Sequence, residues 1–478
     1  MTAAMFIDPH PSRVPAVRFD AHGRRHVDLR AVIGLALPLM LNSAVQLLLN
    51  LTDTWYIGRI STTAMAAMGA TNFLAIVVLL AVGGVGLCVQ TLVAQAYGAR
   101  SSLRASRGVW MGLWAALLTT PIFAGVAFAG VWLFMPFGLP ADIQSAATEY
   151  WTPRLLGGPL SVALWALSGF FNGIGRTRVT FFVMVLVAVL NALLNDVLIF
   201  RLGLGIAGSA WATTLSVGAG TALAAALFLS PSVQNPYRTR RTWRPTRKGL
   251  RRVFALGIPT GMFPAVDLVA ISLFQIMQVR LGAVEGAATQ IVMMLTSLAY
   301  MPAIGIAMAG TTLVGQSIGA GDKAWAARMG NTTIVLVTAY MGAVGVAIGL
   351  GGPWLVPLFI DGSDPAARDV IRLGLTLVWI GGAYQLFDGM NLASAFCLRG
   401  AGDVKVPTRY LMLLAWGGFV PLAHMFSFAP GKGWVDFLPQ FGWGAAGGWA
   451  AALVYIVALG VMMGLRWRSG AWQAIKLT

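Results

Sequence analysis

Four aspartates lie inside long apolar stretches of this sequence: Asp53, Asp196, Asp267 and Asp388. The whole chain has only 16 acidic residues, so these positions are unusual. A charged side chain near the centre of a bilayer costs at least about 2.5–3.5 kcal/mol, and such residues usually line a polar cavity where they handle an ion or a charged ligand.

Buried carboxylates of this kind suit one particular chemistry. Removal from water disfavours the charged form of a carboxylate, and a nearby cation favours it. One site can therefore hold a proton, a sodium ion or an organic cation, but only one at a time. This competition is the minimum mechanism of antiport, so the sequence predicts a transporter whose cargo and coupling ion are positive.

Two of the four aspartates lie deepest. Asp267 comes 15 residues after Arg252 and 13 before Arg280, which places it roughly 20 Å from either end of a helix. Asp388 is similarly remote from the arginines before and after it. Asp267 and Asp388 are therefore the first candidates for cation or proton coupling, with Asp53 as the third, and a sodium ion could bind at the Asp267–Asp388 pair.

Asp53 and Asp196 lie closer to the ends of their segments, each a few residues before an arginine, so an interfacial ion pair is the alternative there. Amides and hydroxyls on nearby segments could complete a polar site in the N-terminal half, although polar residues also hold membrane helices together. The supporting set comprises Gln46, Asn191, Asn195, Asp196 and Thr213.

Around the two deep aspartates, the second half of the chain supplies a proline and several soft or aromatic side chains. Pro264 precedes Asp267 by three residues, where it frees a backbone carbonyl and can act as a hinge, or merely as an ordinary kink. Adaptable side chains suit a cavity that accepts varied apolar cations, with packing as the alternative for each. The cavity candidates are Tyr300, Met293, Met294, Phe387 and Met390.

The composition is that of a polytopic membrane protein. Of 478 residues, 58% are hydrophobic and 10% are charged, with a mean hydropathy of +0.76, whereas soluble domains carry about 25% charged residues. No phosphate-binding loop and no nucleophile with a partner base is recognisable, so we expect neither an enzyme nor ATP-driven transport. The two cysteines, both in apolar context, exclude a disulfide framework, and no cofactor is expected besides the transported Na⁺ or H⁺.

The apolar residues form twelve segments of spanning length. We place them at 30–56, 64–97, 108–135, 147–171, 178–200, 207–230, 252–279, 285–317, 331–359, 370–396, 406–427 and 444–465. Residues 1–29 are expected to be a disordered cytoplasmic arm, and 466–478 a cytoplasmic tail. Basic residues concentrate in alternate loops, which by the positive-inside rule puts both termini in the cytoplasm of a bacterial-type inner membrane.

The second half of the chain repeats the first. At a constant offset of 221 residues, Pro38 matches Pro259 and Gln95 matches Gln316, with Gly98-Ala99 matching Gly319-Ala320. The sequence therefore predicts an all-α protein of two homologous six-helix bundles, 30–230 and 252–465. Because six is even, the bundles share one orientation and are related by an axis along the membrane normal. The substrate is expected in the cleft between them.

The net charge of +17 is concentrated in the linker between the bundles, 231–251. Its densest run, at 238–252, adjoins membrane spans, so contact with anionic lipid headgroups explains it better than nucleic-acid binding. We expect no nucleic-acid partner and a monomeric protein.

Several segments together resemble one family. These are LPLMLNSAVQLLLNLTDTWYIGRI around Asp53, the Q-x-x-G-A pattern at Gln95 and Gln316, NGIGRTRVTFFVMVLVAVLNALLNDVLIF, GIAGSAWATTLS around Thr213, GIPTGMFPAVD ending at Asp267, and QLFDGMNLASAFCLRGAGD around Asp388. The chain resembles the multidrug and toxic compound extrusion (MATE) transporters, in particular the NorM-like branch, over essentially all of residues 30–465.

The resemblance implies a V of two six-helix bundles around a central cavity, and export of organic cations in exchange for Na⁺ or H⁺. It also implies a cation site at Asp267 and Asp388, and a polar site at Asp53, Asn191 and Thr213. One departure matters: some members have an aspartate at the position of Asn195, whereas here the carboxylate comes one residue later. That shift rotates it about 100° around the helix and favours the C-terminal pair as the coupling centre.

Two alternatives remain. A lipid-linked oligosaccharide flippase of the same superfamily would carry an anionic cargo and should place basic residues in its cavity, whereas the deep charges here are acidic. A channel or sensor without coupled transport fits the repeated two-bundle architecture less well than a rocking antiporter. The coupling ion, the exported compounds and the role of the N-terminal arm are left open by the sequence.

Overall fold

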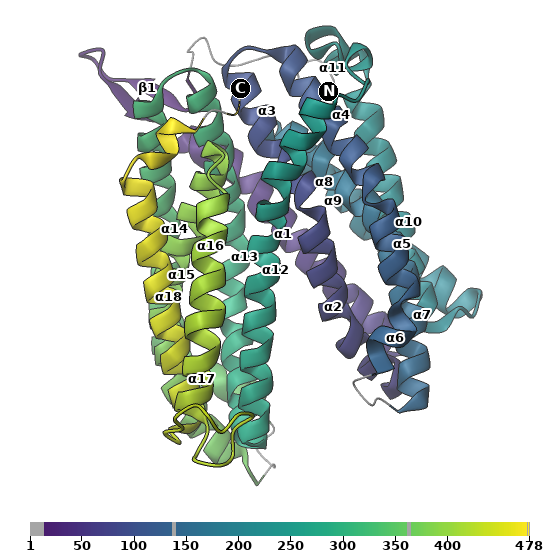
Figure 1. The fold of residues 1–478 in the computed structure, drawn as a ribbon, viewed down its shortest axis with the longest axis vertical. Coiled ribbons are helices and arrows are strands. Elements are labelled where there is room, and N and C mark those ends of the chain that lie inside the picture. Colours follow the sequence, from purple (N-terminus) through teal and green to yellow (C-terminus); the bar gives the residue numbers. More distant parts are fainter. Residues whose placement is uncertain (1–13, 136–139, 361–364, 476, 478) are drawn as a thin grey trace.

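The computed structural model describes residues 14–135, 140–360, 365–475 and 477, and nearly all of them are helical. Figure 1 shows two bundles of long helices that lie close together at the end carrying both chain termini and diverge toward the opposite end. The expected all-α, V-shaped architecture is confirmed.

The first bundle, called the N-lobe here, comprises the helices from α1 to α10. Their bounds are α1 (Leu29–Gly58), α2 (Thr62–Leu87), α3 (Val89–Gly98), α4 (Ser102–Leu118), α5 (Thr120–Phe128), α6 (Gly130–Phe134), α7 (Ala141–Leu156), α8 (Gly158–Gly173), α9 (Thr177–Asn195), the π-helix η2 (Asp196–Arg201) and α10 (Gly205–Phe228).

The second bundle, the C-lobe, follows two short linker helices, α11 (Pro231–Tyr237) and η3 (Thr239–Arg241). Its elements are α12 (Arg247–Leu281), α13 (Ala283–Gly319), α14 (Lys323–Leu355), η4 (Val356–Phe359), α15 (Ala367–Ala401), α16 (Lys405–Leu414), the π-helix η5 (Ala415–Phe419), α17 (Val420–Ser427), α18 (Gly444–Arg468) and η6 (Ala471–Ala474). The seventh span thus begins at Arg247, five residues before its apolar run.

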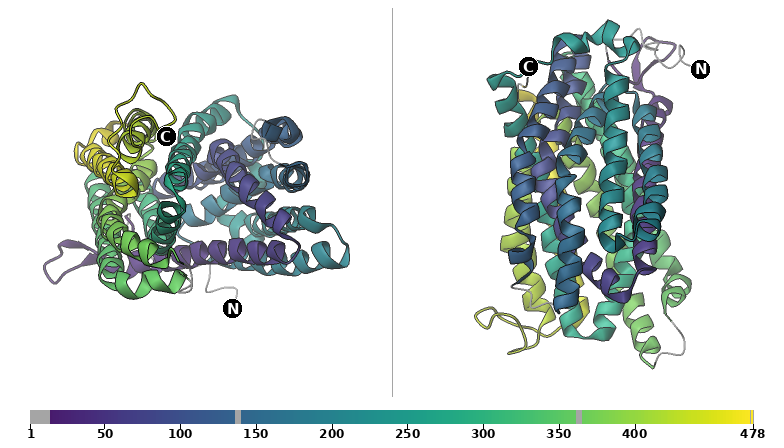
Figure 2. Two further views of the ribbon diagram at one scale, coloured as in Figure 1. Left: turned by 90° about the horizontal axis from the view of Figure 1, so that it is seen from below. Right: turned by 90° about the vertical axis from the view of Figure 1, so that its right-hand side faces the viewer.

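Eleven helices are long and apolar enough to cross a membrane, and α7 with α8 forms a further pair, bent by 41° at Gly157. Counted as one span, this pair brings the number to twelve, as the sequence predicts. Seen along the helices, the two lobes form separate groups, and α1 runs obliquely from the C-lobe side into the N-lobe (Figure 2).

Paired hydrogen bonds join the lobes at the terminus-bearing end. Gln95 donates to the carbonyl of Gly400 at 3.0 Å, and Gln316 donates to the carbonyl of Gly173 at 2.8 Å. Likewise, the hydroxyl of Thr91 donates to the Arg399 carbonyl and that of Thr312 to the Asn172 carbonyl, both at 3.0 Å. Because each bond has its repeat-related counterpart in the other lobe, the lobes meet through a pseudo-two-fold axis.

Glycines bring the two backbones into contact beside these bonds. A Cβ built at Gly98 would collide with the Gln316 carbonyl, and one built at Gly319 would collide with the equivalent Gln95 carbonyl. Gly84 is pressed in the same way against Gly257 and Gly261. Small residues are therefore needed where the helices of the two lobes approach most closely.

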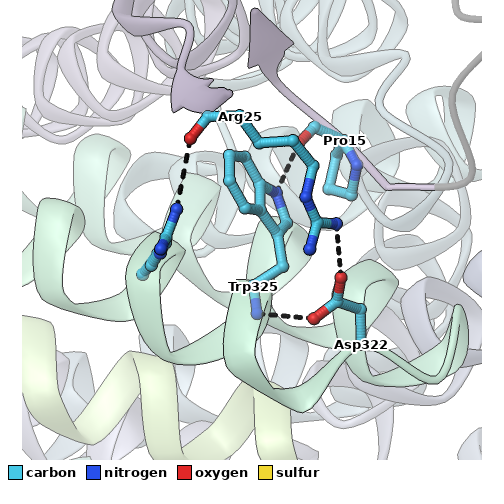
Figure 3. A network of polar contacts seen from close by, with 5 residues as sticks. Pro15, Arg25, Asp322 and Trp325 are labelled. Atoms are coloured by element: carbon cyan, nitrogen blue, oxygen red, sulfur yellow. Dashed lines mark hydrogen bonds and ion pairs between the residues drawn. The ribbon is translucent and has the colours of Figure 1, made fainter. Parts of the chain in front are cut away.

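The N-terminal arm is ordered from residue 14, so the expectation of disorder is wrong for this part; residues 1–13 lie outside the described residues. Strands β1 (Val17–Phe19) and β2 (Arg25–Val27) form an antiparallel hairpin that lies on the C-lobe beside the start of α14 (Figure 3). Arg25 pairs with Asp322 at 2.6 Å, and the Trp325 indole donates to the Pro15 carbonyl at 2.9 Å. These partners are about 300 residues away in the chain, so local composition could not reveal the order.

Asp322 is the anchor of the hairpin on the membrane surface. Its second oxygen accepts the backbone N–H of Trp325 at 2.8 Å, capping α14. Partial burial acts to raise the pKa of Asp322, but this hydrogen bond and the nearby Arg25 and Arg328 outweigh it, so the pKa lies below its usual range. The carboxylate is consequently charged at neutral pH and holds the hairpin through an ion pair.

Candidate functional site

The C-lobe brings the two deepest aspartates together. Asp267 on α12 and Asp388 on α15 lie close enough for their charges to interact. The hydroxyl of Tyr455, on α18, donates to Asp267 Oδ1 at 2.8 Å. Tyr300 and Tyr384 lie within the same range of both carboxylates. Neither aspartate has an ion-pair partner among the described residues, so this cluster carries two acidic groups and no internal cation.

Local features of two helices position this cluster. Pro259 and Pro264 both lie inside the continuous helix α12, and Asp267 follows the second proline by one turn. Tyr455 stacks on Phe419 with ring centroids 4.8 Å apart, and Phe419 is supplied by the π-helical turn η5. π-helical turns insert an extra residue and often mark functional sites; here the turn aligns the ring that holds Tyr455 in place.

The C-lobe pair has oxygen donors but no preformed metal cage. Among the described residues, no group of three or more His, Cys, Asp or Glu side chains could hold a metal ion. A sodium ion at Asp267 and Asp388 would therefore need hydroxyl or backbone carbonyl oxygens as further ligands, since hard cations prefer oxygen. A proton needs only one of the carboxylates.

The N-lobe contains a second acidic site, built around Asp53 on α1. Asp53 is 5% exposed and accepts hydrogen bonds from Asn195 at 2.7 Å and from the Thr213 hydroxyl at 3.1 Å. Asn191 donates to Thr213 at 3.2 Å and accepts from Asn195 at 3.1 Å. The helices α1, α9 and α10 thus bring together the polar residues that the sequence predicts in the N-terminal half.

A cavity of about 80 Å³ opens beside Asp53. Gln46 and Thr213 line it, as do Tyr150 and Arg154 from α7. Arg154 interacts electrostatically with both Asp53 and Tyr150. The N-lobe site therefore pairs one carboxylate with one built-in cation, unlike the C-lobe site.

Asp196 is not part of this cluster. It lies in η2 with a side chain that is 44% exposed, and it pairs with Arg201 at 3.0 Å. The one-residue displacement from Asn195 turns it away from Asp53, and the interfacial ion pair that the sequence left open is what forms.

The cavity candidates of the C-lobe lie in different surroundings. Tyr300 is near both aspartates, whereas Met390 and the backbone of Phe387 pack against Gly460 of α18. Met293 is half-buried and Met294 is exposed. Contact of these side chains with a substrate stays a prediction, as does the hinge role of Pro264.

Two functional candidates were missed from the sequence, and each has a visible signal. Tyr455 is a tyrosine in the middle of the last apolar segment, where a buried hydroxyl needs a partner. Arg154 is a basic residue within the fourth segment, and a charge inside a span is itself a functional signal. Their partners, however, lie on other helices, so their roles required the tertiary structure.

Known proteins match this chain over most of its length. The family described as MatE matches residues 38–197 and 269–423. The probable multidrug resistance protein NorM of Pseudomonas putida is 31% identical, with the match covering 92% of this chain and 95% of that protein. The corresponding protein of Burkholderia pseudomallei is 30% identical over 87% of this chain and 89% of its own length.

Solved structures agree in fold. A crystal structure of MATE in complex with MaL6 superposes with a TM-score of 0.81 at 21% identity and covers 92% of this chain and 95% of that one. An outward-facing conformation of a multidrug resistance MATE family transporter gives a TM-score of 0.80 at 21% identity over 92% and 94% of the two chains.

Proposed function

Because this chain belongs to the MatE family of multidrug efflux transporters, we propose that it is a secondary antiporter that exports organic cations in exchange for Na⁺ or H⁺. It is a multi-pass membrane protein, and no cofactor is needed besides the transported ion. Asp267 and Asp388 are the coupling groups.

One observation carries this proposal: two carboxylates share the interior of the C-lobe without an ion-pair partner among the described residues. Two like charges in a site of low dielectric favour the uptake of a positive ion, because it offsets both the desolvation and the mutual repulsion. A proton, a sodium ion and an organic cation can each do this, and binding of one discourages the others.

Alternating access couples this competition to transport. The lobes are closed together at the terminus-bearing end by the paired Gln95 and Gln316 contacts and diverge at the other end (Figure 1). An external cation and a substrate that favour different states would drive the exchange, each shifting the balance only by its differential affinity.

We place the terminus-bearing end in the cytoplasm of a bacterial inner membrane, which makes the V outward-open. The positive-inside rule supports this orientation, because the basic linker 238–252 lies at the same end. A groove between α4 and α12 gathers basic side chains from that region and from α4: Arg104, Arg107, Lys248, Arg251 and Arg252. Anionic lipid headgroups are the natural partners for it, and the transporter is a monomer that binds no nucleic acid.

The test is ethidium transport by purified protein in liposomes, with a sodium gradient and a pH gradient imposed separately. Movement driven by either gradient would support antiport and name the coupling ion. If neither gradient drives ethidium through correctly folded protein, antiport of organic cations is refuted, and transport of labelled lipid carriers becomes the assay of choice.

A further inference from the structure

The N-lobe cavity differs from a simple cation site in its charges. Most of its polar lining consists of amides and hydroxyls, and only two lining residues are charged: Asp53 and Arg154. Both oxygens of Asp53 already accept hydrogen bonds within the lobe, Oδ1 from Asn195 and Oδ2 from Thr213. The carboxylate is thus partly satisfied before any ligand binds.

Arg154 is the group with unused binding capacity. It lies in the last turn of α7, is half-buried, and reaches the cavity. Its Nη1 is fully enclosed and has no hydrogen-bond partner in the described part of the chain, and no ion pair closer than 4.0 Å joins it to Asp53. A guanidinium has five N–H donors and no acceptor, so this side chain is ready to receive oxygen atoms.

The charges of the cavity therefore balance without a bound cation. Asn195 is neutral where some members of the family have an aspartate, and Arg154 adds a positive charge near Asp53. A simple cation entering here would be attracted by one group and repelled by the other. A ligand with an anionic group is not repelled, because a planar carboxylate can accept two parallel hydrogen bonds from a guanidinium.

We propose that this cavity is a specificity subsite in which Arg154 binds the carboxylate of amphoteric substrates, meaning organic cations that also carry an acidic group. The inference rests on the proposed export of organic cations. At about 80 Å³, the cavity is smaller than the roughly 300–1,000 Å³ of a complete ligand pocket. It takes the carboxyl end of the substrate, next to the apolar side chains of Trp165 and Met184, while the rest extends into the space between the lobes.

The test compares two dyes that differ in one group. Rhodamine B carries a cationic ring system and a free carboxylate, and its ethyl ester keeps the cation but lacks the acid. Binding of both dyes to the purified full-length protein is measured by fluorescence anisotropy, which requires no gradient. We expect Arg154→Gln to weaken binding of the acid about tenfold, as loss of a charge-assisted hydrogen bond predicts, and to leave the ester unchanged or tighter.

Two further variants make the comparison sharp. Arg154→Lys keeps the charge but not the planar donor pair, so it should lose part of the preference for the acid and guards against misfolding of the glutamine variant. Arg201→Gln removes the same charge from the same lobe at an exposed position outside the cavity, and should change neither dye.

The outcomes separate the two proposals. Equal changes for acid and ester in Arg154→Gln, or an equal effect of Arg201→Gln, would overturn the subsite. Selective loss of acid binding supports it. If that selectivity appears while neither a sodium nor a pH gradient moves either dye in liposomes, the antiport proposal fails and the subsite stands.

Discussion

Gln46 in the N-lobe and Asp267 in the C-lobe occupy equivalent positions of the repeat, 221 residues apart. At the later offset of 227 residues, set by Gly173 and Gly400, Asp388 corresponds to Ser161. Both N-lobe counterparts line the cavity beside Asp53. Conversely, the counterpart of Asp53 is Phe274, which is buried against Trp449 at 5.7 Å. Each lobe has its carboxylates where the other has none.

The contacts between the lobes behave in the opposite way. The Gln95 and Gln316 bonds, and the Thr91 and Thr312 bonds, recur in both halves. Surfaces that meet across a pseudo-two-fold axis must each fit the other, so a change on one side requires a matching change on the other. The lobe interiors do not touch, and their chemistry could therefore diverge: two acids in the C-lobe, an acid with an arginine in the N-lobe.

The largest expected effect tests whether coupling belongs to the C-lobe alone. Asp267→Asn and Asp388→Asn should each abolish gradient-driven ethidium efflux in proteoliposomes, because a neutral amide can hold neither a proton nor a sodium ion. Asp369→Asn, an exposed substitution on the same helix as Asp388, is the control and should retain efflux. Full activity in both site variants would remove the C-lobe from the mechanism.

The next prediction concerns the N-lobe charge balance. Asp53→Asn leaves Arg154 as an unbalanced cation in the cavity, which should cost about 2 kcal/mol and slow transport of a simple cationic dye about thirtyfold. Adding Arg154→Gln to Asp53→Asn should recover most of the rate, because the cavity is again neutral. A double-mutant cycle of initial rates measures this coupling, and purely additive losses would show that the two charges act independently.

A smaller effect is expected from the hydroxyl that contacts Asp267. Tyr455→Phe removes one hydrogen bond to a carboxylate, worth about 1.5 kcal/mol, so the affinity for the coupling cation should change about tenfold. Thr213→Val removes one of two donors from Asp53 and should leave that affinity unaltered if the N-lobe does not bind the coupling ion. Calorimetric titration with sodium or a proton-release assay distinguishes the two variants.

The symmetry of the closed end predicts matched effects. Gln95→Leu and Gln316→Leu each remove one hydrogen bond between the lobes, worth about 1 kcal/mol, and should shift the conformational balance about fivefold away from the observed state. Distances between spin labels on α7 and α17 report this shift. Unequal shifts for the two variants would show that the pseudo-two-fold contacts are not energetically equivalent.

The smallest effect concerns a feature that only the C-lobe has. Asp322, at the start of α14, corresponds to Ser101 in the repeat, and only Asp322 anchors the N-terminal hairpin. Because its folded pKa lies below the unfolded 3.8, the anchoring is complete above that value and is lost as the pH falls through the folded pKa. Asp322→Asn should cost less than about 1 kcal/mol.

Trypsin cleavage at Arg24 measures this release. Cleavage should accelerate in Asp322→Asn at neutral pH, while ethidium efflux remains unchanged. If the hairpin stays protected in the variant, the Trp325 contact with Pro15 is the main anchor instead.

The amino-acid sequence by itself determined the membrane class, the number of spans, the repeat and the two deep aspartates, because these follow from the length and spacing of apolar runs. It also contained both readings of Asp196, an interfacial ion pair or a member of the N-lobe site. Only the tertiary structure decided between them, since one residue of helical rotation separates Asp196 from Asn195.

Other features depended on partners from distant parts of the chain. The Tyr455 hydroxyl reaches Asp267 across 188 positions, and Arg25 reaches Asp322 across 297. The spacing of residues within one helix is set by local geometry and can be predicted from the sequence. The pairing of side chains on different helices depends on how the lobes pack, so the opposite charge balance of the two lobes became visible only in the folded protein.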